Sequence, residues 1–527
     1  MKKKASAQIT IFLSLTLLLV LSIVFVSLES ARAEGLKLRV ATAANASIES
    51  VFAQYDRVLY EEFGLLMFTD KDGSLEDFKS EALKYAEKNS GSDWLSFDVN
   101  DIEITDYMKA TDDSGEVFIN AVAYYMKASG LAEEAIELSK SAKSNLSGSA
   151  DDVISEDGEI DFSAIKSKIE DSDDAVAEAK KKAEEAAANE AAAAASEASA
   201  GGEASASGRS EADEASEKSG KAAVSEATDK QKADYSSIKN NFSNWKSKGI
   251  LMLVVDDVED ISEEIYDKSE LPSDLSDTEK ERSGGNAGEI DATDKILLCE
   301  YFMRRFESYT SDGTNGLQLE RLICGKDSDL SNAASIAKRL IAIRFAADYL
   351  AIKNMGEMTL EAAALATAIV GWTGVTSLVD AVKEIILVVW ALGEAICDVK
   401  TLFAGKKVAL IKNESNWNLS WENLIAGKLK TASGEGDEDG LSYEGYLRVL
   451  LYLKDKEEIA YRGMDIIQGK VRESEDAFRF SNCIYAANIK LSANASSLFP
   501  LLKKNFTYSY GAEAAYCYGS VEGFGSE

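Results

Sequence analysis

The pattern of apolar residues begins with an unbroken apolar run close to the N-terminus. Residues Ile9 to Leu28 are almost wholly apolar, and Lys2, Lys3 and Lys4 precede them. Twenty residues in a helix rise about 30 Å, which is the thickness of the hydrocarbon layer of a bilayer. The run therefore predicts a single transmembrane helix at 9–28. The lysines favour a cytoplasmic leader, residues 1–8, with the bulk of the chain outside the cytoplasm.

Three fates of this apolar run are compatible with the sequence. It could stay as an anchor, it could be processed near its cytoplasmic end as in prepilins, or it could be a secretory signal cleaved at Ala31-Arg32-Ala33. A signal peptide has an apolar core of roughly 7 to 15 residues, which is shorter than this run. We therefore favour a retained anchor, and all three fates place the rest of the chain outside the cytoplasm.

Beyond the run, apolar residues recur at spacings of three and four, which is the period of one helix face. They are Val40, Ala44, Ile48, Val51, Phe52, Tyr55 and Leu59. This stripe predicts that the membrane helix continues as a spine whose outer half packs against a domain. Gly35 is the one residue expected to loosen that continuity.

Residues 29–135 are predicted to hold this spine and a small α+β domain. Short apolar bursts or alternating patterns predict strands, and three-to-four spacing predicts helices. The predicted strands are Leu65–Phe68, Trp94–Val99 and Ile102–Thr105, and the predicted helices are Glu76–Asn89, capped by Ser74, and Val117–Leu131.

Residues 136–234 read as an insert that buries little. Asp171 to Ala200 consists mainly of Ala, Glu and Lys and predicts an exposed helix, whereas the Ser-, Ala-, Glu- and Gly-rich stretch Gly201 to Asp229 predicts disorder. The insert would divide the ectodomain in two.

Residues 235–527 are predicted to form a mainly helical domain with a few strands. Helices are expected at Tyr235–Trp245, Lys295–Phe306, Ser442–Leu453 and Glu457–Val471, a strand at Ile250–Val255, and a strand pair around Gly511 within Asn505–Tyr518. A further helix, capped by Asp329 or Ser331, would bury Ile336, Leu340, Ile343, Ala347 and Leu350.

The most apolar part of the ectodomain lies between Glu361 and Cys397. Ala362 to Val379 is just long enough to span a bilayer, but the next run, Ile385 to Leu392, is too short to return. We favour a buried helical hairpin over a second membrane contact. With the other elements, this predicts a predominantly α-helical α+β protein.

Composition narrows the range of functions. The formal net charge is -34 and no basic stripe occurs, which argues against a nucleic-acid partner. The chain has no histidine, so Ser-His-Asp and Cys-His catalysis and histidine metal sites are excluded. The five cysteines, Cys299, Cys324, Cys397, Cys483 and Cys517, are scattered, and we expect buried free thiols.

Two acidic turns resemble calcium loops but lack the required ligands. If Gly73 or Gly440 were the turn glycine of an EF-hand, Lys79 or Tyr446 would stand where the bidentate glutamate belongs. No other motif carries chemistry. We therefore expect no catalytic, cofactor-binding or metal-binding residue, no cofactor, and a protein that is not an enzyme.

Several segments resemble an uncharacterised family of Gram-positive bacterial membrane proteins associated with tight-adherence (Tad) type pilus loci. They are Ser6–Val20, Leu28–Arg32, Ala53–Leu65, Leu319–Asp329 and Ala404–Val408. The start of the chain is more weakly similar to TadE-like pseudopilins, which have a glutamate near the beginning of their apolar helix. Ile11 stands at that position here.

The resemblance implies a membrane-anchored, extracytoplasmic structural or assembly component of a Tad-like pilus or secretion apparatus, acting through protein contacts. Its partners would be the membrane and other subunits of the assembly. The alternative is a cell-surface binding module or receptor tethered by the N-terminal signal anchor. Its candidate binding residues are Trp94, Trp372, Trp417, Trp421 and the terminal tyrosines.

Overall fold

The computed structural model describes most of the chain outside the predicted insert. The described residues are 2–144, parts of 166–181, 229–256, 258–262, 264–266, 270–281, 291–311, 316–431, 436–437, 439–498 and 506–519. The chain forms two compact units. Unit 1 comprises Met1–Lys140, Asp267–Phe306 and Leu451–Glu527, and unit 2 comprises Ser141–Tyr266 and Glu307–Leu450. Residues 235–527 contribute to both units.

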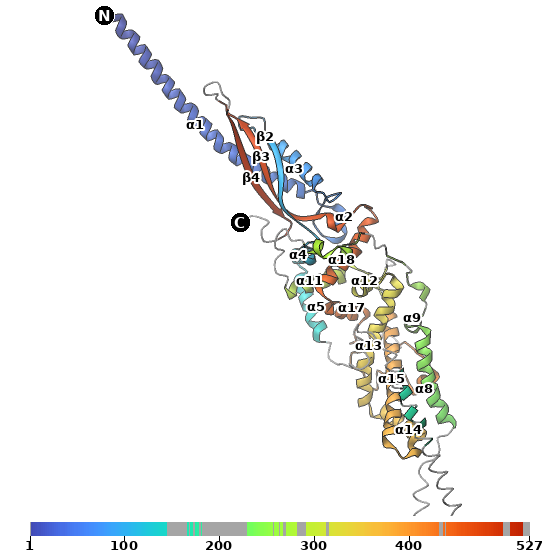
Figure 1. Ribbon diagram of the computed structural model, residues 1–527. Coiled ribbons are helices and arrows are strands. Elements are labelled where there is room, and N and C mark those ends of the chain that lie inside the picture. Colours follow the sequence, from blue (N-terminus) through green and yellow to red (C-terminus); the bar gives the residue numbers. More distant parts are fainter. Residues whose placement is uncertain are drawn as a thin grey trace, which may run out of the picture. The chain divides into compact units, whose positions relative to one another are not determined.

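Unit 1 is built on α1, Lys2–Phe52, a helix of 51 residues that continues through Gly35 without a break. Its second half buries one face, with Leu36, Val40, Ala44, Ile48 and Phe52 almost inaccessible to solvent. In Figure 1 the first half extends beyond the rest of the unit. The spine prediction was right in kind but too long, because the helix ends at Phe52. Leu59 is buried on a separate helix, α2 (Arg57–Phe63), and Tyr55 is exposed.

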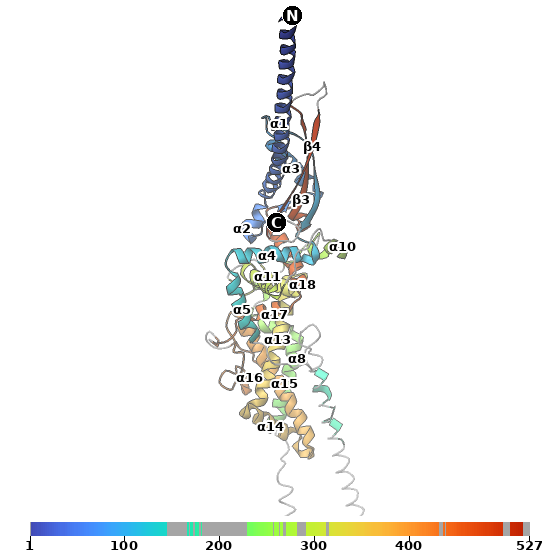
Figure 2. The same cartoon turned by 90° about the vertical axis from the view of Figure 1, so that its left-hand side faces the viewer.

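The second half of α1 packs on an antiparallel sheet. Its strands are β1 (Phe68–Thr69), β2 (Asp98–Lys109), β3 (Cys483–Ser496) and β4 (Thr507–Cys517), and β3 pairs with each of the other three. α1 contacts β3 and β4, and α3 (Glu76–Asn89) contacts α1 and β2, so the two helices cover one face of the sheet, as Figure 2 shows.

Side chains alternate across β3, as a sheet with one covered face requires. Ile489, Leu491, Ala493 and Ala495 are buried, whereas the residues between them are partly exposed. On the open face Lys490 lies opposite Glu103 of β2 on one side and Glu513 of β4 on the other. The open face of the sheet is therefore polar.

The strand predictions were partly wrong. Trp94–Val99 and Ile102–Thr105 do not form two strands, because a single strand, β2, begins at Asp98. The terminal strand pair is also wrong, since β4 runs straight through Gly511 and its partner is β3. β3 itself was missed because its buried positions include small alanines, which give a weak apolar alternation.

α3 has the predicted bounds but a different cap. Leu75 occupies the N-cap position with a left-handed φ of 69° and makes no side-chain cap bond. Instead, buried Asp70 accepts hydrogen bonds from the backbone N–H groups of Leu75 (2.8 Å) and Phe78 (3.4 Å). Ser74 accepts only from Glu76 N–H, at 3.3 Å.

Helices complete unit 1. Its remaining elements are η1 (Asp113–Gly115), α4 (Glu116–Ala128), α5 (Ala132–Ser144, which begins in this unit), η3 (Pro272–Asp274), α10 (Asp277–Lys280), α11 (Ala292–Arg305), α18 (Lys456–Arg472) and η5 (Phe480–Asn482). The helices predicted in the regions of α4, α11 and α18 are confirmed. In the folded unit α11 packs against the other two.

Unit 2 is a helical bundle. It contains α8 (Asp229–Lys248), α9 (Leu251–Val254), η2 (Val258–Asp260), α12 (Gln318–Cys324), α13 (Asp329–Asn354), α14 (Gly356–Val370), η4 (Gly371–Thr373), α15 (Thr376–Phe403) and α16 (Trp421–Ala426). α17 (Tyr443–Leu453) runs across the chain boundary between the two units. α15 contacts α8, α9, α13 and α14, and almost every residue from Ile385 to Phe403 is buried. The predicted buried hairpin is confirmed as α14, η4 and α15.

Three details of unit 2 differ from expectation. Ile250–Val255 is not a strand, because α9 occupies Leu251–Val254. The cap of α13 is Ser328, whose side chain accepts from Ser331 N–H. On that helix Leu350 is exposed, whereas two charged residues, Arg344 and Asp348, are buried. The predictions for Asp171–Asp229 lie largely outside the described residues.

Candidate functional site

Among the described residues of unit 1, the first half of α1 has the longest run of exposed apolar side chains. Its large apolar side chains from Ile9 to Leu28 are 39% to 67% exposed. Polar side chains within the run bond to their own helix: Ser14 donates to Ile11 O at 2.8 Å and Ser22 to Leu19 O at 2.8 Å. Among the described residues, α1 is the one helix long and apolar enough to cross a membrane. Its length and composition are those of a single-pass anchor.

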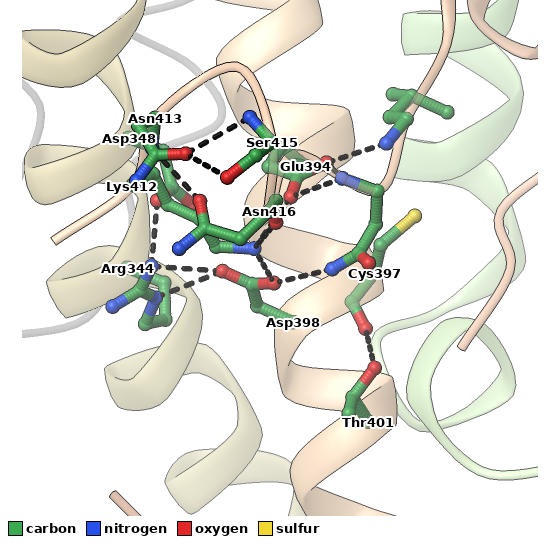
Figure 3. A network of polar contacts seen from close by, with 12 residues as sticks. Arg344, Asp348, Glu394, Cys397, Asp398, Thr401, Lys412, Asn413, Ser415 and Asn416 are labelled. Carbon is green, nitrogen blue, oxygen red and sulfur yellow. Dashed lines mark hydrogen bonds and ion pairs between the residues drawn. The ribbon is translucent and has the colours of Figure 1, made fainter. Parts of the chain in front are cut away.

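Unit 2 contains a contrasting feature, a cluster of buried charged side chains between α13 and α15 (Figure 3). Arg344 of α13 is at its centre. Its Nη2 donates to Asp348 at 2.7 Å, and its Nε donates to Asp398 of α15 at 3.0 Å. Its Nη1 donates to the Tyr446 hydroxyl at 3.1 Å. All four side chains are buried, so the guanidinium group is satisfied by protein groups alone.

Lys412 adds a second cation from the loop after α15. Its Nζ donates to Glu394 and Asp398, both at 2.7 Å, and to the backbone oxygen of Asn416 at 3.0 Å. Figure 3 shows Lys412 near both carboxylates, and Asp398 bridging Lys412 and Arg344. Asp398 therefore joins the two cations into one cluster of five charged residues: Arg344, Asp348, Glu394, Asp398 and Lys412.

The cluster fastens the loop to α15. Glu394 accepts hydrogen bonds from the backbone N–H groups of Asn418 (2.9 Å) and Leu419 (2.7 Å). The buried indole of Trp390 donates to Leu419 O at 2.7 Å. Gly393 permits this approach, because a Cβ there would overlap the side chains of Leu419 and Trp245.

The five charges are two cations and three carboxylates, so the fully ionised cluster would carry one uncompensated negative charge. Burial raises the pKa of Asp348 well above its ordinary value; Arg344 opposes this, and the charges of Asp398 and Glu394 add to it. Asp348 Oδ2 is buried and has no hydrogen-bond partner among the described residues. A proton on Asp348 would therefore make the cluster neutral.

The pKa values of Glu394 and Lys412 are also shifted, by burial and by neighbouring charges. Burial and then the charge of Asp398 raise the pKa of Glu394, against the effect of Lys412. Burial alone would lower the pKa of Lys412, but Asp398 and Glu394 together raise it. The two carboxylates therefore favour the charged form of Lys412 in spite of its burial.

This geometry supports a structural role for the cluster. Its members are at most 6% exposed, so a substrate has no access to them in this conformation. Among the described residues, no group of three or more carboxylate or thiol side chains is placed to hold a metal ion. Removing one partner from a buried ion cluster leaves an uncompensated charge, which is strongly destabilising. The cluster thus specifies how the loop closes on α13 and α15.

Unit 2 has a further buried carboxylate, Glu320, whose described hydrogen-bond partners include no cation. Glu320 of α12 accepts hydrogen bonds from the Tyr443 hydroxyl (2.8 Å) and from Tyr309 N–H (2.9 Å), both on Oε1. Its Oε2 is buried without a partner among the described residues. Burial raises the pKa of Glu320 to about 7. The group is therefore poised to titrate close to neutral pH.

None of the candidate residues from the sequence is a member of the charged cluster, although Cys397 lies between Glu394 and Asp398 on α15 and is drawn beside them in Figure 3. Asp70 caps α3, and Asp437 accepts from Asp439 N–H at 3.1 Å within its own turn. All five cysteines are free; four are buried and Cys517 is partly exposed. Burial raises the pKa of Cys299 to about 12, which makes its thiol inert. Among the candidate binding aromatics, Trp94 is 54% exposed, while Trp372, Trp417 and Trp421 are half-buried.

Sequence reasoning missed the charged cluster, although a signal for it exists. Arg344 and Asp348 are four residues apart on α13, and Glu394 and Asp398 are four residues apart on α15. Residues at this spacing share one helix face. Glu394 lies inside the apolar stretch from Glu361 to Cys397 and Asp398 directly follows it, where an unpaired charge would be very costly. Charges placed there indicate partners elsewhere in the chain, but not which ones.

Comparison with known proteins gives a family and nothing more specific. A family of unknown function, DUF5702, matches residues 228–495, just over half of the chain. The matched region runs from α8 to β3 and includes all five residues of the charged cluster; α1 precedes it. No curated protein and no solved structure matches the chain. The chain belongs to the family of unknown function DUF5702.

Proposed function

We propose that this chain is a membrane-anchored, extracytoplasmic structural or assembly component of a Tad-like pilus or secretion apparatus, working through protein contacts. One observation carries the proposal: α1 is a single helix with an exposed apolar first half and a second half packed on an antiparallel sheet. A tether would need only the first half. Because α1 is unbroken, its packed second half would hold the folded unit in a fixed position relative to the first half in the membrane. Such a connection suits a subunit that packs by its N-terminal helix.

Partner recognition would take place along the spine. Association within a bilayer relies on packing and polar contacts, because lipid offers no hydrophobic drive between helices. Ser14, Thr16, Ser22 and Ser27 are the small polar candidates in the run. Glu29 is less available, since its carboxylate lies 3.4 Å from Arg32 of its own helix and is largely buried.

The proposal is tested by deleting the chain in the bacterium that encodes it and restoring it in two forms. The first is the wild type, and the second has Ile9–Leu28 replaced by an unrelated apolar helix of equal length. We expect the deletion to abolish surface assembly, the wild type to restore it, and the swapped chain to reach the membrane without restoring it. Immunogold labelling of surface filaments and membrane fractionation are the measurements.

Two results would contradict the proposal. Unchanged surface assembly in the deletion strain would remove the chain from the apparatus altogether. Full restoration by the swapped chain would reduce residues 9–28 to a tether and favour the second candidate, a cell-surface binding module. One observation favours that second candidate. Ile411 is 84% exposed, and its neighbour Lys412 is buried in the charged cluster, so an apolar side chain points to solvent from a loop that the cluster holds in place.

A further inference from the structure

The apolar half of α1 ends at a point where two other segments of unit 1 are fastened to it. Arg32, one turn after Leu28, is only 4% exposed. Its Nε donates to Trp94 O at 2.5 Å and its Nη1 to Ser496 O at 2.8 Å. The Leu498 N–H donates to Glu29 Oε2 at 3.3 Å. One turn of the helix therefore holds both the segment before β2 and the end of β3.

These fastened segments expose large apolar side chains. Trp94 is 54% exposed, Leu498 45% and Phe506 52%. Phe506 belongs with the other two because its backbone oxygen accepts from Ser497 N–H at 2.8 Å, next to Leu498. We call Trp94, Leu498 and Phe506 the collar.

The collar continues the apolar surface of α1. Residues 9–28 are exposed over about 30 Å of helix, and the helix reaches Glu29 without interruption. A bilayer that covers this run would have its outer surface close to Glu29 and Arg32, the level at which the collar is held. Tryptophan and tyrosine are enriched at that level, where an aromatic body meets the headgroups. The open face of the sheet is polar, so the collar differs from the face beside it.

We propose that the collar inserts into the headgroup region of the bilayer from which α1 emerges, and so fixes the orientation of unit 1 against the membrane. The occupant is lipid rather than a protein, because the collar adjoins the apolar half of α1, which the proposed anchoring places in lipid. Arg32 and Glu29 are held by protein groups at this boundary and do not need the headgroups as partners. The inference rests on the anchoring part of the proposed function.

The test uses the full-length chain in phosphatidylcholine vesicles, with and without bromine atoms near the top of the acyl chains. Bromine quenches tryptophan emission only at short range. Trp94 is the sole tryptophan of unit 1, since the other five, Trp245, Trp372, Trp390, Trp417 and Trp421, belong to unit 2. We expect brominated lipid to quench a component of the wild-type emission that is lost in Trp94→Phe.

Additional variants in the Trp94→Phe background extend the test to the rest of the collar. Leu498→Trp and Phe506→Trp should each restore the quenched component. Tyr60→Trp is the matched control, because Tyr60 is 43% exposed on α2, beyond the end of α1. From Glu29 to the end of α1 the helix rises about 35 Å, so this control should add emission that brominated lipid leaves unchanged.

The outcomes separate the collar from the anchor. Equal fractional quenching in the wild type and Trp94→Phe, or in the collar variants and the Tyr60→Trp control, would overturn the collar while the chain stays in the membrane. A wild-type chain that leaves the vesicles in a carbonate wash would overturn the anchor, and the collar with it.

Discussion

The first half of α1 and the helix α15 are both long and apolar, but they treat their polar side chains in opposite ways. In α1, Ser14 and Ser22 bond back to their own helix, and the apolar side chains are exposed. In α15, Glu394 and Asp398 bond to other segments of the chain, and nearly all apolar side chains are buried. Self-satisfied polar groups suit a helix whose surroundings offer no partners, as in lipid. Charges that need partners suit a helix enclosed by protein.

The comparison also shows what an average hydropathy leaves out. Both runs are apolar because both avoid water, and the average does not say whether lipid or protein replaces it. The pairing of charges does show whether lipid or protein surrounds the helix. A charge inside an apolar helix is tolerated only where a counter-charge meets it, and Arg344 and Lys412 meet Asp398 from two different segments.

The largest effect is expected from deleting the exposed half of α1, the part that distinguishes this helix from α15. A chain that begins at Glu29 lacks the exposed half of α1 but keeps Arg32 and Leu36, which are buried. It should be soluble, whereas the full-length chain should remain in membranes after a carbonate wash. Fractionation followed by immunoblotting measures both. If the shortened chain still partitions into membranes, a second segment of the chain contacts lipid, and the collar and the bilayer-length run Ala362–Val379 are the first to examine.

The next largest effect is expected from breaking the charged cluster, which supplies the partners of Glu394 and Asp398 in α15. Lys412→Met leaves Glu394 and Asp398 without one cation, and such a loss from a buried pair costs about 3–5 kcal/mol. Urea unfolding of the detergent-solubilised chain, followed by tryptophan emission, reports on unit 2, which holds five of the six tryptophans. The control is Lys353→Met, which removes an exposed pair with Glu384 at 2.8 Å and should cost less than about 1 kcal/mol. Equal effects of the two substitutions would mean that the cluster contributes no more than a surface pair.

A smaller effect concerns Glu320, the buried carboxylate whose described hydrogen-bond partners include no cation. Because the folded-state pKa is raised to about 7 from an ordinary 4.5, the folded chain keeps a proton that the unfolded chain releases. Stability from this group is therefore present below pH 4.5 and is lost as pH rises towards 7. Glu320→Gln cannot titrate, so its stability relative to the wild type should rise by roughly 3 kcal/mol between pH 4 and pH 8.

Urea unfolding at several pH values measures this difference. Glu320→Gln is not expected to alter the fold, because the amide oxygen of a glutamine can accept the hydrogen bonds of Tyr443 and Tyr309. The substitution Glu357→Gln, at an exposed position of α14, serves as the control and should leave the pH profile as it is. Parallel profiles for the wild type and Glu320→Gln would show that the carboxylate does not titrate in this range.

The smallest effect tests how closely α15 is packed. Gly393→Ala adds a Cβ that overlaps Leu419 and Trp245, and overpacking of a core typically costs about 1–3 kcal/mol. Gly356→Ala is the matched control, because nothing lies within 4 Å of a Cβ at the start of α14. Thermal unfolding of the two variants compares them directly. No loss of stability in Gly393→Ala would indicate that the loop after α15 can move away from the helix.

The sequence by itself determined the elements whose signal is local. An apolar run of bilayer length predicted the exposed half of α1, and three-to-four spacing predicted α3, α4, α11, α17 and α18. Helices can be recognised in this way because their hydrogen bonds and their apolar stripe both lie within one short segment. The same holds for the buried hairpin of α14 and α15, whose apolar content is contiguous.

Only the tertiary structure decided which distant segments meet. β3 was missed, and β2 was divided in two, because a strand is stabilised by partners that are far away in sequence: Ile102 pairs with Leu491. The charged cluster has the same origin, since Arg344, Asp398 and Lys412 come from three segments and their spacing reveals the helix face but not the counter-charge. Local periodicity specifies a helix, whereas the partner of a strand or of a buried charge is chosen by the packing of the whole unit.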